Sequence, residues 1–340
     1  MKIAMDAMGG DHAPAEIVKG AAKASEDKDL EIILIGDEEK IRKYLPEGSK
    51  NISIRHTDEY IEMQESPSSA LRKKPRASII VGAEMLKSKE ADALISAGNT
   101  GAFLEAVVLH AGRIKSGATK IKRPAISVVL PAFRKPTVLL DAGANPECKP
   151  EYMLQFAKMG CTYAKNILNV KNPTVGLVNI GSEDNKGSTF IKATYDLLSS
   201  SGLNFTGNAE PGDIMNGTVD VAVADGFTGN IILKTAEATG ELVTSLIKKH
   251  VSSSLPAKLG ALLMKGVFKK IKKDMDHSEH GGALLFGIDG ICIKAHGRAK
   301  RDAVWNAINV AKRMIKRDII RKFAEDLSEG ADRNGSNSDE

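Results

Sequence analysis

Aromatic residues are scarce in this chain of 340 residues, making up only 4% of it. This scarcity argues against recognition of single-stranded nucleic acid by stacking, so we predict no nucleic-acid partner. The three cysteines, Cys148, Cys161 and Cys292, are far apart and form no CxxC pair. They indicate a reducing compartment and no structural zinc. No apolar run approaches the roughly 18–20 residues of a membrane-spanning helix, and no signal peptide is visible.

Several catalytic motifs are missing as well. Residues 7–11 lack the GxGxxG pattern of a dinucleotide-binding turn. Residues 181–188 resemble a Walker A loop with lysine and glycine reversed, so they can hold phosphate but do not predict ATP hydrolysis. No GxSxG elbow is present and no cysteine has a nucleophile context, so covalent catalysis is not indicated. His277 and His280 do not form HExxH, and we predict neither a metal nor a cofactor.

Five apolar segments end in Asp, Ser or Asn followed by glycine within one to three residues. Glycine permits positive φ and lets backbone amides approach a ligand closely. One such turn is ordinary loop chemistry. Five turns with polar tips favour one shared cleft that binds anions. The predicted strands before these turns are Lys2–Asp6, Ala93–Ser96, Val138–Asp141, Val175–Asn179 and Val219–Ala224.

The alternation of strand and helix patterns continues to about residue 245 and predicts an α/β fold with a parallel-rich sheet covered on both faces. The length allows two domains of ordinary size. The turns at 98–101 and 226–229 share the pattern Gly-x-Thr-Gly, which hints at two similar halves that face one cleft. Thr100 and Thr228 are candidates to cap the helices that follow these turns.

Residues 255–275 form a lysine-rich amphipathic segment with exposed leucines. Such a helix can lie in a membrane interface, or it can pack on the body of the protein or on a second subunit. Gly260 and Gly266 are possible breaks in it. We predict membrane contact at Leu255, Leu259, Leu262, Leu263 and Val267. Residues 329–340 are expected to be a disordered tail.

Four long motifs, at residues 5–14, 95–101, 140–145 and 225–230, resemble one family. It is the bacterial phosphate acyltransferase that acts on acyl-acyl carrier protein at the start of phospholipid synthesis. The resemblance extends from residue 1 to about 325. It implies that inorganic phosphate attacks the thioester of acyl-acyl carrier protein, giving an acyl phosphate and the free thiol.

The resemblance also implies a fold like that of phosphate acetyltransferase and the isocitrate and isopropylmalate dehydrogenases, with two α/β domains around a central cleft. We expect residues 1–145 with 298–328 in one domain and residues 146–297 in the other, with a helical tip at 252–276. The family is dimeric and works beside the membrane. The expected location is therefore cytoplasmic, on the inner face of the membrane near the acyltransferase that uses the acyl phosphate. Arg298 stands where the family usually has a small residue.

Site roles follow from this reaction. Lys186 is expected to neutralise phosphate, and Asn179 and Asn230 to donate amide hydrogen bonds. His12 or His296 could protonate the departing thiolate. The other residues predicted to bind phosphate or the acyl substrate are Gly9, Gly10, Asp11, Ser96, Gly98, Asn99, Thr100, Gly101, Asp141, Gly143, Asn145, Gly181, Asp225, Gly226, Thr228 and Gly229. For Asp6, Asp141 and Asp225 we favour a structural role, because a bare carboxylate would repel phosphate.

Other questions stay open at this point. The acidic carrier protein could dock on Arg72, Lys73, Lys74 and Arg76 or on the basic helix at 298–322. Segments 281–287 and 255–268 could line an acyl groove, although core packing explains them equally well. The alternatives are a phosphate acetyltransferase that uses coenzyme A, a nicotinamide dehydrogenase of related fold, and a membrane-bound scaffold with a degenerate site.

Overall fold

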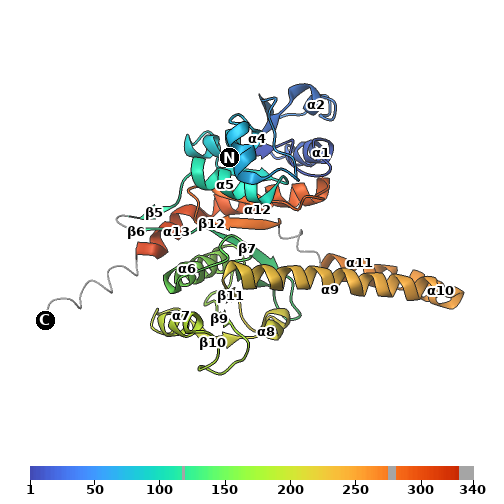
Figure 1. Ribbon diagram of the computed structural model, residues 1–340. Helices are drawn as coiled ribbons and strands as arrows, with labels where there is room; N and C mark the ends of the chain where they lie inside the picture. Colours follow the sequence, from blue (N-terminus) through green and yellow to red (C-terminus); the bar gives the residue numbers. More distant parts are fainter. Residues whose placement is uncertain (117–118, 275–280, 329–340) are drawn as a thin grey trace.

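The structure, a computed structural model, describes residues 1–116, 119–274 and 281–328, and one large sheet runs through it with helices on both faces (Figure 1). Its eleven strands are β1 (Lys2–Asp6), β2 (Glu31–Gly36), β3 (Ile52–His56), β4 (Ala93–Ser96), β7 (Ala125–Leu130), β8 (Thr137–Leu140), β9 (Val175–Val178), β10 (Phe205–Ala209), β11 (Val221–Val223), β12 (Ala283–Phe286) and β13 (Ile291–Lys294). A separate hairpin pairs β5 (Lys115–Ser116) with β6 (Thr119–Lys120).

The strand order is β10-β9-β11-β8-β7-β12-β13-β4-β1-β2-β3. Five strands, from β13 to β3, form one parallel block, and four, from β8 to β10, form a second. Between them β7 and β12 pair antiparallel with each other and with the block beside each. The predicted parallel-rich α/β sheet is confirmed, and the two blocks run in opposite directions.

The register of the middle strands brings the ends of both blocks to one level. Ile293 of β13 pairs with Leu284 of β12, Leu284 pairs with Ser127 of β7, and Ser127 pairs with Leu140 of β8. Because Leu140 is the last residue of β8 and Ile293 is the last but one of β13, the two carboxyl ends overlap near the centre of the sheet. Ligands of open α/β sheets bind at such ends.

Alternating residues of each strand face different helices. In β1, Ile3 and Met5 pack with helices α1 and α12, whereas Ala4 packs with α4 and α5. This period of two is what burial on both faces requires of a central strand. The helices are α1 (Ala15–Ala24), α2 (Glu38–Arg42), α3 (Pro67–Lys73), α4 (Ser78–Lys87), α5 (Thr100–His110), α6 (Pro150–Asn166), α7 (Thr189–Ser199), α8 (Pro211–Asn216), α9 (Gly226–Ser252), α10 (Leu255–Leu263), α11 (Lys265–Asp274), α12 (Arg301–Lys316) and α13 (Ile319–Ser328).

Two of the predicted helix assignments need correction. The single amphipathic segment at 255–275 is two helices, separated at Met264 rather than at Gly260 or Gly266. The final basic helix is also divided, because Asp318 adopts a positive φ of 51° between α12 and α13. A residue in that conformation cannot continue a right-handed helix.

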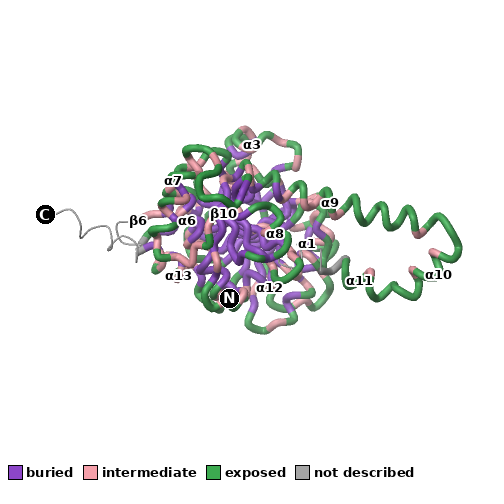
Figure 2. Tube along the Cα trace, turned by 90° about the horizontal axis from the view of Figure 1, so that it is seen from below, coloured by how far each residue is buried: buried purple, intermediate pink, exposed green. Residues whose placement is uncertain are grey.

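The end of α9 with α10 and α11 projects from the body as an arm, which we define as residues 241–274 (Figure 1). Every residue from 241 to 250 is exposed, and Figure 2 shows the arm as largely exposed, with a few intermediate stretches. Leu259, Leu262 and Leu263 are 65, 66 and 89% exposed. In the described part of the chain, no helix is both long and apolar enough to cross a membrane.

Of the last two helices, α12 packs on the first block of the sheet, and α13 packs on α6, the helix that covers the second block. Helix α12 packs on α1, where Gly20 leaves no room for a side chain beside Val304. Helix α13 lies on α6, where Lys322 donates a hydrogen bond to Asn166 at 2.5 Å. The proposed two-domain division, with 298–328 assigned to the first domain, stays a prediction. The predicted tail at 329–340 lies outside the described residues.

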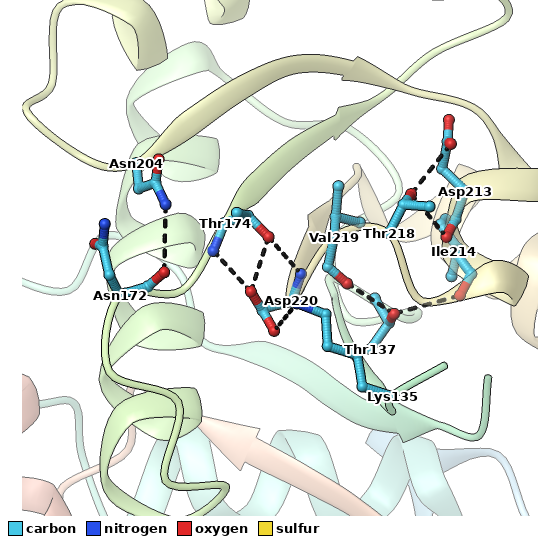
Figure 3. A network of polar contacts seen from close by, with 10 residues as sticks. All are labelled: Lys135, Thr137, Asn172, Thr174, Asn204, Asp213, Ile214, Thr218, Val219 and Asp220. Carbon is cyan, nitrogen blue, oxygen red and sulfur yellow. Dashed lines mark hydrogen bonds and ion pairs between the residues drawn. The ribbon is translucent and has the colours of Figure 1, made fainter. Parts of the chain in front are cut away.

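A buried carboxylate ties together the starts of three strands in the second block (Figure 3). Asp220, 3% exposed, accepts hydrogen bonds from the backbone and hydroxyl of Thr174 at 2.9 and 2.8 Å, and Lys135 lies 2.6 Å away. Burial alone would raise the pKa of Asp220, but Lys135 and Thr174 outweigh burial and hold that pKa below its ordinary value.

We predict that Asp220→Asn destabilises the fold by about 1–3 kcal/mol near pH 7, because one partner of a buried charged contact is lost. A depressed folded-state pKa gives stability that is present above the ordinary value of 3.8 and is lost as pH falls through the folded pKa. Urea unfolding of wild type and variant should therefore converge in acid. The matched control is Asp58→Asn, whose carboxylate is exposed. A constant difference between pH 7 and pH 3 would contradict this assignment.

Candidate active site

A cavity of about 490 Å³ opens where the two blocks overlap. We call it the central cavity, and its volume is in the ordinary range for small-molecule sites. Four of the five glycine-tipped turns contribute to its wall, so the predicted convergence is confirmed for these four; it is wrong for the turn at 180–188, none of whose residues lines the cavity. Its lining includes Asp11, Met63, Thr100, Ile126, Val128, Ala142, Gly143, Asn230, Leu233, Lys234, Glu237, Gly281, Gly282, Ala283, Lys294, Ala295, His296, Gly297, Arg298 and Ala303.

A larger cavity of about 720 Å³ lies at the opposite ends of β4 and β13, beside Asp92 and Ile291. None of the five predicted turns lines it. Because ligands of this sheet type bind at carboxyl ends and not at amino ends, the central cavity is the better candidate for catalysis.

The first wall of the central cavity is organised by Asp6, at the end of β1. This buried carboxylate accepts hydrogen bonds from Met8 N at 3.2 Å and from the hydroxyls of Ser78 and Ser96, both at 2.7 Å. The Ser96 hydroxyl in turn accepts from Gly98 N at 3.0 Å. Asp6 therefore fastens the turn after β1 to the turn after β4, as the structural role predicted for it requires.

Close backbone packing completes this wall. A side chain at Gly9 would lie 2.7 Å from Gly98 N, and one at Gly10 would lie 3.1 Å from Gly297 O. Asp11 N donates to Gly297 O at 2.8 Å, which joins the first turn to the segment after β13. Ser96 and the glycines at 9, 10 and 98 thus shape the wall, while Asp11 and Thr100 face the cavity.

The second wall is organised by Asp141, which is fully buried after β8. Its oxygens accept from Asn145 N at 2.7 Å, from the Asn145 amide at 2.8 Å and from the backbone amides of residues 126, 143 and 144 at 3.0–3.1 Å. Burial raises the pKa of Asp141, and hydrogen bonds from the turn oppose that rise. Asp141 and Asn145 form hydrogen bonds within the turn and with Ile126 N and Pro124 O beside it, so the structural role again accounts for them.

Helix α9 starts against this turn. A side chain at Gly229 would stand 1.9 Å from Asp141 O, so only glycine allows this approach. Asn230 follows it, lines the cavity and lies about 3.6 Å from the position a side chain would take at Gly143. Asp225 accepts from the amide and hydroxyl of Thr228, both at 2.9 Å.

The helix caps differ from the prediction. Asn99, and not Thr100, caps α5 by accepting from Ala102 N at 3.1 Å. Asp225, and not Thr228, caps α9. In both turns the stronger capping residue stands one to three positions before the threonine. Gly101 lies against Pro67, and the Asn99 amide also donates to Met63 O and Glu65 O at 3.0 Å, which places α3 beside the cavity.

Lys186 and Asn179 lie apart from the central cavity. Asn179 is buried, donates to Lys186 O at 3.1 Å and accepts from Ile180 N at 2.8 Å. Lys186 is half exposed and lies 3.6 Å from Glu183, and Gly181 packs beside both of those side chains. This geometry makes Asn179 a support for its own turn, and the phosphate contact of Lys186 stays a prediction.

The two candidate histidines differ in position. His296 and Arg298 line the central cavity, whereas His12 does not. Arg298 N donates to His296 Nδ1 at 3.1 Å, so a neutral His296 carries its proton on Nε2. His277 and His280, for which we predicted no metal site, lie outside the described residues.

Sequence reasoning missed Lys294, the last residue of β13. Its side chain is only 8% exposed, yet it lines the central cavity. The available signal was a lysine at the end of an apolar strand, the same position that Ser96 occupies in the neighbouring strand β4 and Asp6 in β1, the next strand. Lys294 was missed because the pattern used, an Asp, Ser or Asn at the end of a strand and followed closely by glycine, does not include lysine.

The cysteines do not offer a nucleophile. Cys148 is half-buried and Cys161 is buried, and burial raises the pKa of each thiol to about 12. Cys292 is fully buried, and burial raises its pKa too. A thiol that stays protonated at neutral pH is a poor nucleophile, which favours direct attack of one substrate on the other.

Comparison with solved structures defines the class of fold. A phosphotransacetylase from Streptococcus pyogenes superposes with a TM-score of 0.61 at 15% identity, covering 92% of this chain and 93% of that one. The EutD phosphotransacetylase from Staphylococcus aureus gives 0.59 at 15% identity, covering 92% and 94%. The phosphate acetyltransferase-like architecture is confirmed, and the cavity between the blocks is the candidate substrate site of this α/β protein.

Sequence comparison gives the family. A family described as fatty acid synthesis protein matches residues 1–322. Curated relatives named phosphate acyltransferase include one from Dictyoglomus turgidum, 46% identical over 98% of this chain and 99% of its own, and one from Desulfitobacterium hafniense, 47% identical over 96% and 98%. The chain belongs to this family, and it is an enzyme that transfers an acyl group to phosphate in fatty acid and phospholipid synthesis. The dehydrogenase and the non-catalytic scaffold are thereby set aside.

Proposed function

We propose that the acyl donor is acyl-acyl carrier protein and that inorganic phosphate attacks its thioester in the central cavity. The observation that carries this proposal is the meeting of four glycine-rich turns from both blocks around one cavity with a buried ammonium in its wall. Near neutral pH phosphate is largely dianionic and needs no strong base. Orientation supplies roughly 7–11 kcal/mol of the rate enhancement, and each oxyanion donor roughly 3–4 kcal/mol.

The donors nearest to the reacting groups in this proposal are the Asn230 side chain and the backbone amide of Thr100 at the start of α5. Asn230 lies near the beginning of α9 and lines the central cavity, so its side-chain amide can donate to a bound anion. Lys186 is proposed to reach phosphate from the neighbouring turn, since its contact with Glu183 is exposed and weak.

The carrier protein is proposed to dock beside α3. Arg72, Lys73 and Arg76 are exposed there, whereas Lys74 is taken up by Glu65 at 2.6 Å. The segment before α3 contributes Met63 to the cavity wall, so an acidic partner on this helix would stand at the entrance. Such complementarity speeds association and selects the partner.

We propose that the arm has two functions. Its tip, with Leu255, Leu259, Leu262, Leu263 and Val267, contacts the inner face of the membrane, near the enzyme that consumes acyl phosphate. The exposed stripe of Leu242, Val243, Leu246 and Ile247 on α9 pairs with a second copy in a homodimer.

The first prediction concerns the donor. Release of free thiol should require inorganic phosphate, with kcat/KM roughly ten-fold or more higher for acyl-acyl carrier protein than for acyl-coenzyme A, because of electrostatic docking.

Lys186→Ala should lower kcat/KM for phosphate roughly 10–100-fold, as expected for loss of a charged contact. Lys192→Ala, an exposed lysine on α7, is its control. Equal use of both thioesters would argue for the coenzyme A alternative, and unchanged turnover in Lys186→Ala would remove Lys186 from the site.

The second prediction concerns the tip. Leu259→Ser and Leu263→Ser should each weaken binding to vesicles of anionic phospholipid roughly ten-fold, measured by co-sedimentation. Each substitution removes one leucine side chain, and with it the favourable free energy of transferring that side chain from water into the membrane. Leu109→Ser on α5 is the matched control, since Leu109 is also exposed, at 64%, but lies outside the arm. Equal binding by all four proteins would show that the tip does not touch the membrane.

The third prediction concerns assembly. Light scattering should give twice the chain mass of 36.4 kDa for the wild type. Leu242→Glu combined with Leu246→Glu should give the single-chain mass, because two charges would be buried in the paired stripe. Leu109→Glu should leave the mass unchanged. A monomeric wild type would refute the dimer.

A further inference from the structure

Lys294 is a buried lysine in the wall of the central cavity. Lysine is almost never fully buried unless it is paired, because an ammonium loses its hydration inside a protein. Here the side chain is 8% exposed and belongs to a strand whose four residues are all buried. A residue of this kind at a cavity wall calls for a reason beyond packing.

Its position follows from the strand register. Lys294 pairs with Ser96 in β4, and Ser96 pairs with Asp6 in β1, so the three polar ends stand in one row on the same face of the sheet. In this row the ammonium of Lys294 lies at the cavity, the hydroxyl of Ser96 is in the middle, and the carboxylate of Asp6 is farthest from Lys294. The Ser96 hydroxyl is turned to Asp6 at 2.7 Å.

The contacts of the ammonium leave donors for a ligand. Nζ donates to Ala295 O at 2.6 Å, and an ammonium has three hydrogens to donate. Asp6 and Asp11 influence Lys294 from a distance, but across residues 1–116, 119–274 and 281–328 neither forms an ion pair with it within 4.0 Å. A lysine that served only to neutralise Asp6 would touch that carboxylate. The oxygens of Asp6 are occupied by Met8, Ser78 and Ser96 instead.

Burial lowers the pKa of Lys294 to about 8, although Asp6 and Asp11 oppose that effect. The other charged and titratable groups around the cavity are Lys234, Glu237, His296 and Arg298. A group whose pKa is near the working pH both holds a proton and gives it up readily, which general acid catalysis requires.

We propose that Lys294 is a catalytic residue that contacts the tetrahedral intermediate and protonates the departing thiolate. This role rests on the proposed acyl carrier protein thioester as donor. A phosphate oxygen forms a bond to the acyl carbon, and the carbon–sulfur bond then breaks, with its electron pair going to sulfur. The ammonium gives its proton to that sulfur, and the resulting amine takes the proton of the phosphate hydroxyl. The products are an acyl phosphate dianion and a free thiol, so protons and charge balance.

The test uses Lys294→Met, which keeps the length of the side chain without charge, and Lys294→Arg, which keeps the charge but does not release a proton. Each full-length protein is assayed with phosphate and acyl thioesters of two thiols. One is the alkyl thiol of acyl carrier protein, and the other is an aryl thiol whose thiolate is stable without protonation. We expect kcat to fall 10²–10⁴-fold for the alkyl thioester in both variants and much less for the aryl thioester.

The outcomes separate the possible roles. An equal loss for both thioesters, with rescue by Lys294→Arg, would show that Lys294 only provides charge, and it would overturn the proposal. Turnover of both variants within three-fold of wild type would overturn it too. A wild type that shows no phosphate-dependent thiol release from acyl carrier protein would refute the proposed donor instead.

The pH profile gives a second readout in a variant that keeps the buried charge. In the wild type, kcat should fall as pH rises through the pKa of the acid, because only the ammonium can donate. In Lys294→Arg that limb should move to higher pH or disappear. An unchanged limb would assign the proton transfer to another group, such as His296, which also lines the cavity. Thermal unfolding of each variant checks that it is folded.

Discussion

One row of paired residues across the middle strands determines where the enzyme can have a site. The blocks point in opposite directions, so in a sheet without stagger their carboxyl ends would lie at opposite edges. The pairing of Ile293, Leu284, Ser127 and Leu140 brings those ends to one level instead. Because side chains alternate along a strand, a slip of one residue between β7 and β8 would turn Leu140 to the other face and move Asp141 away from Ile126. The site thus depends on register more than on any single loop.

Buried carboxylates and glycines make different contributions to the structure of the site. Asp6 is the last residue of β1 and Asp141 directly follows β8, and the oxygens of each accept hydrogen bonds from amides or hydroxyls of the adjoining turns and neighbouring elements. These bonds fix the turns and keep the buried negative charge occupied within the protein. Glycine at positions such as 229 allows the helix to press on the turn. Phosphate can therefore meet backbone amides and cations in a cavity whose structural acids are already committed.

Several strands of the fold and several parts of the candidate site could be predicted from the sequence. The physical reasons for that success also explain which features could not be predicted. The bounds of β1 and β4 were predicted as observed, because continuous apolar runs with sharp polar ends define buried parallel strands. Direction and order were not accessible, since an apolar run such as Ala125–Leu130 reads the same in a parallel or an antiparallel neighbourhood. The caps were misassigned because Asn99 and Asp225 compete with the nearby threonines, and hydrogen-bond geometry decides that competition. Lys294 was missed because its burial comes from strands distant in sequence.

The buried ammonium and the anionic substrate are thermodynamically linked. Desolvation disfavours the charged form of Lys294, and Asp6 and Asp11 compensate only from a distance. A phosphate dianion that enters the central cavity supplies the missing charge, so it must raise the pKa of this lysine, and a protonated lysine must in turn bind phosphate more tightly. The acid is therefore most fully charged when both substrates are in place. Once the thiol has been protonated, the amine takes the proton of the phosphate hydroxyl, so the ammonium is restored and Lys294 is ready for the next turnover.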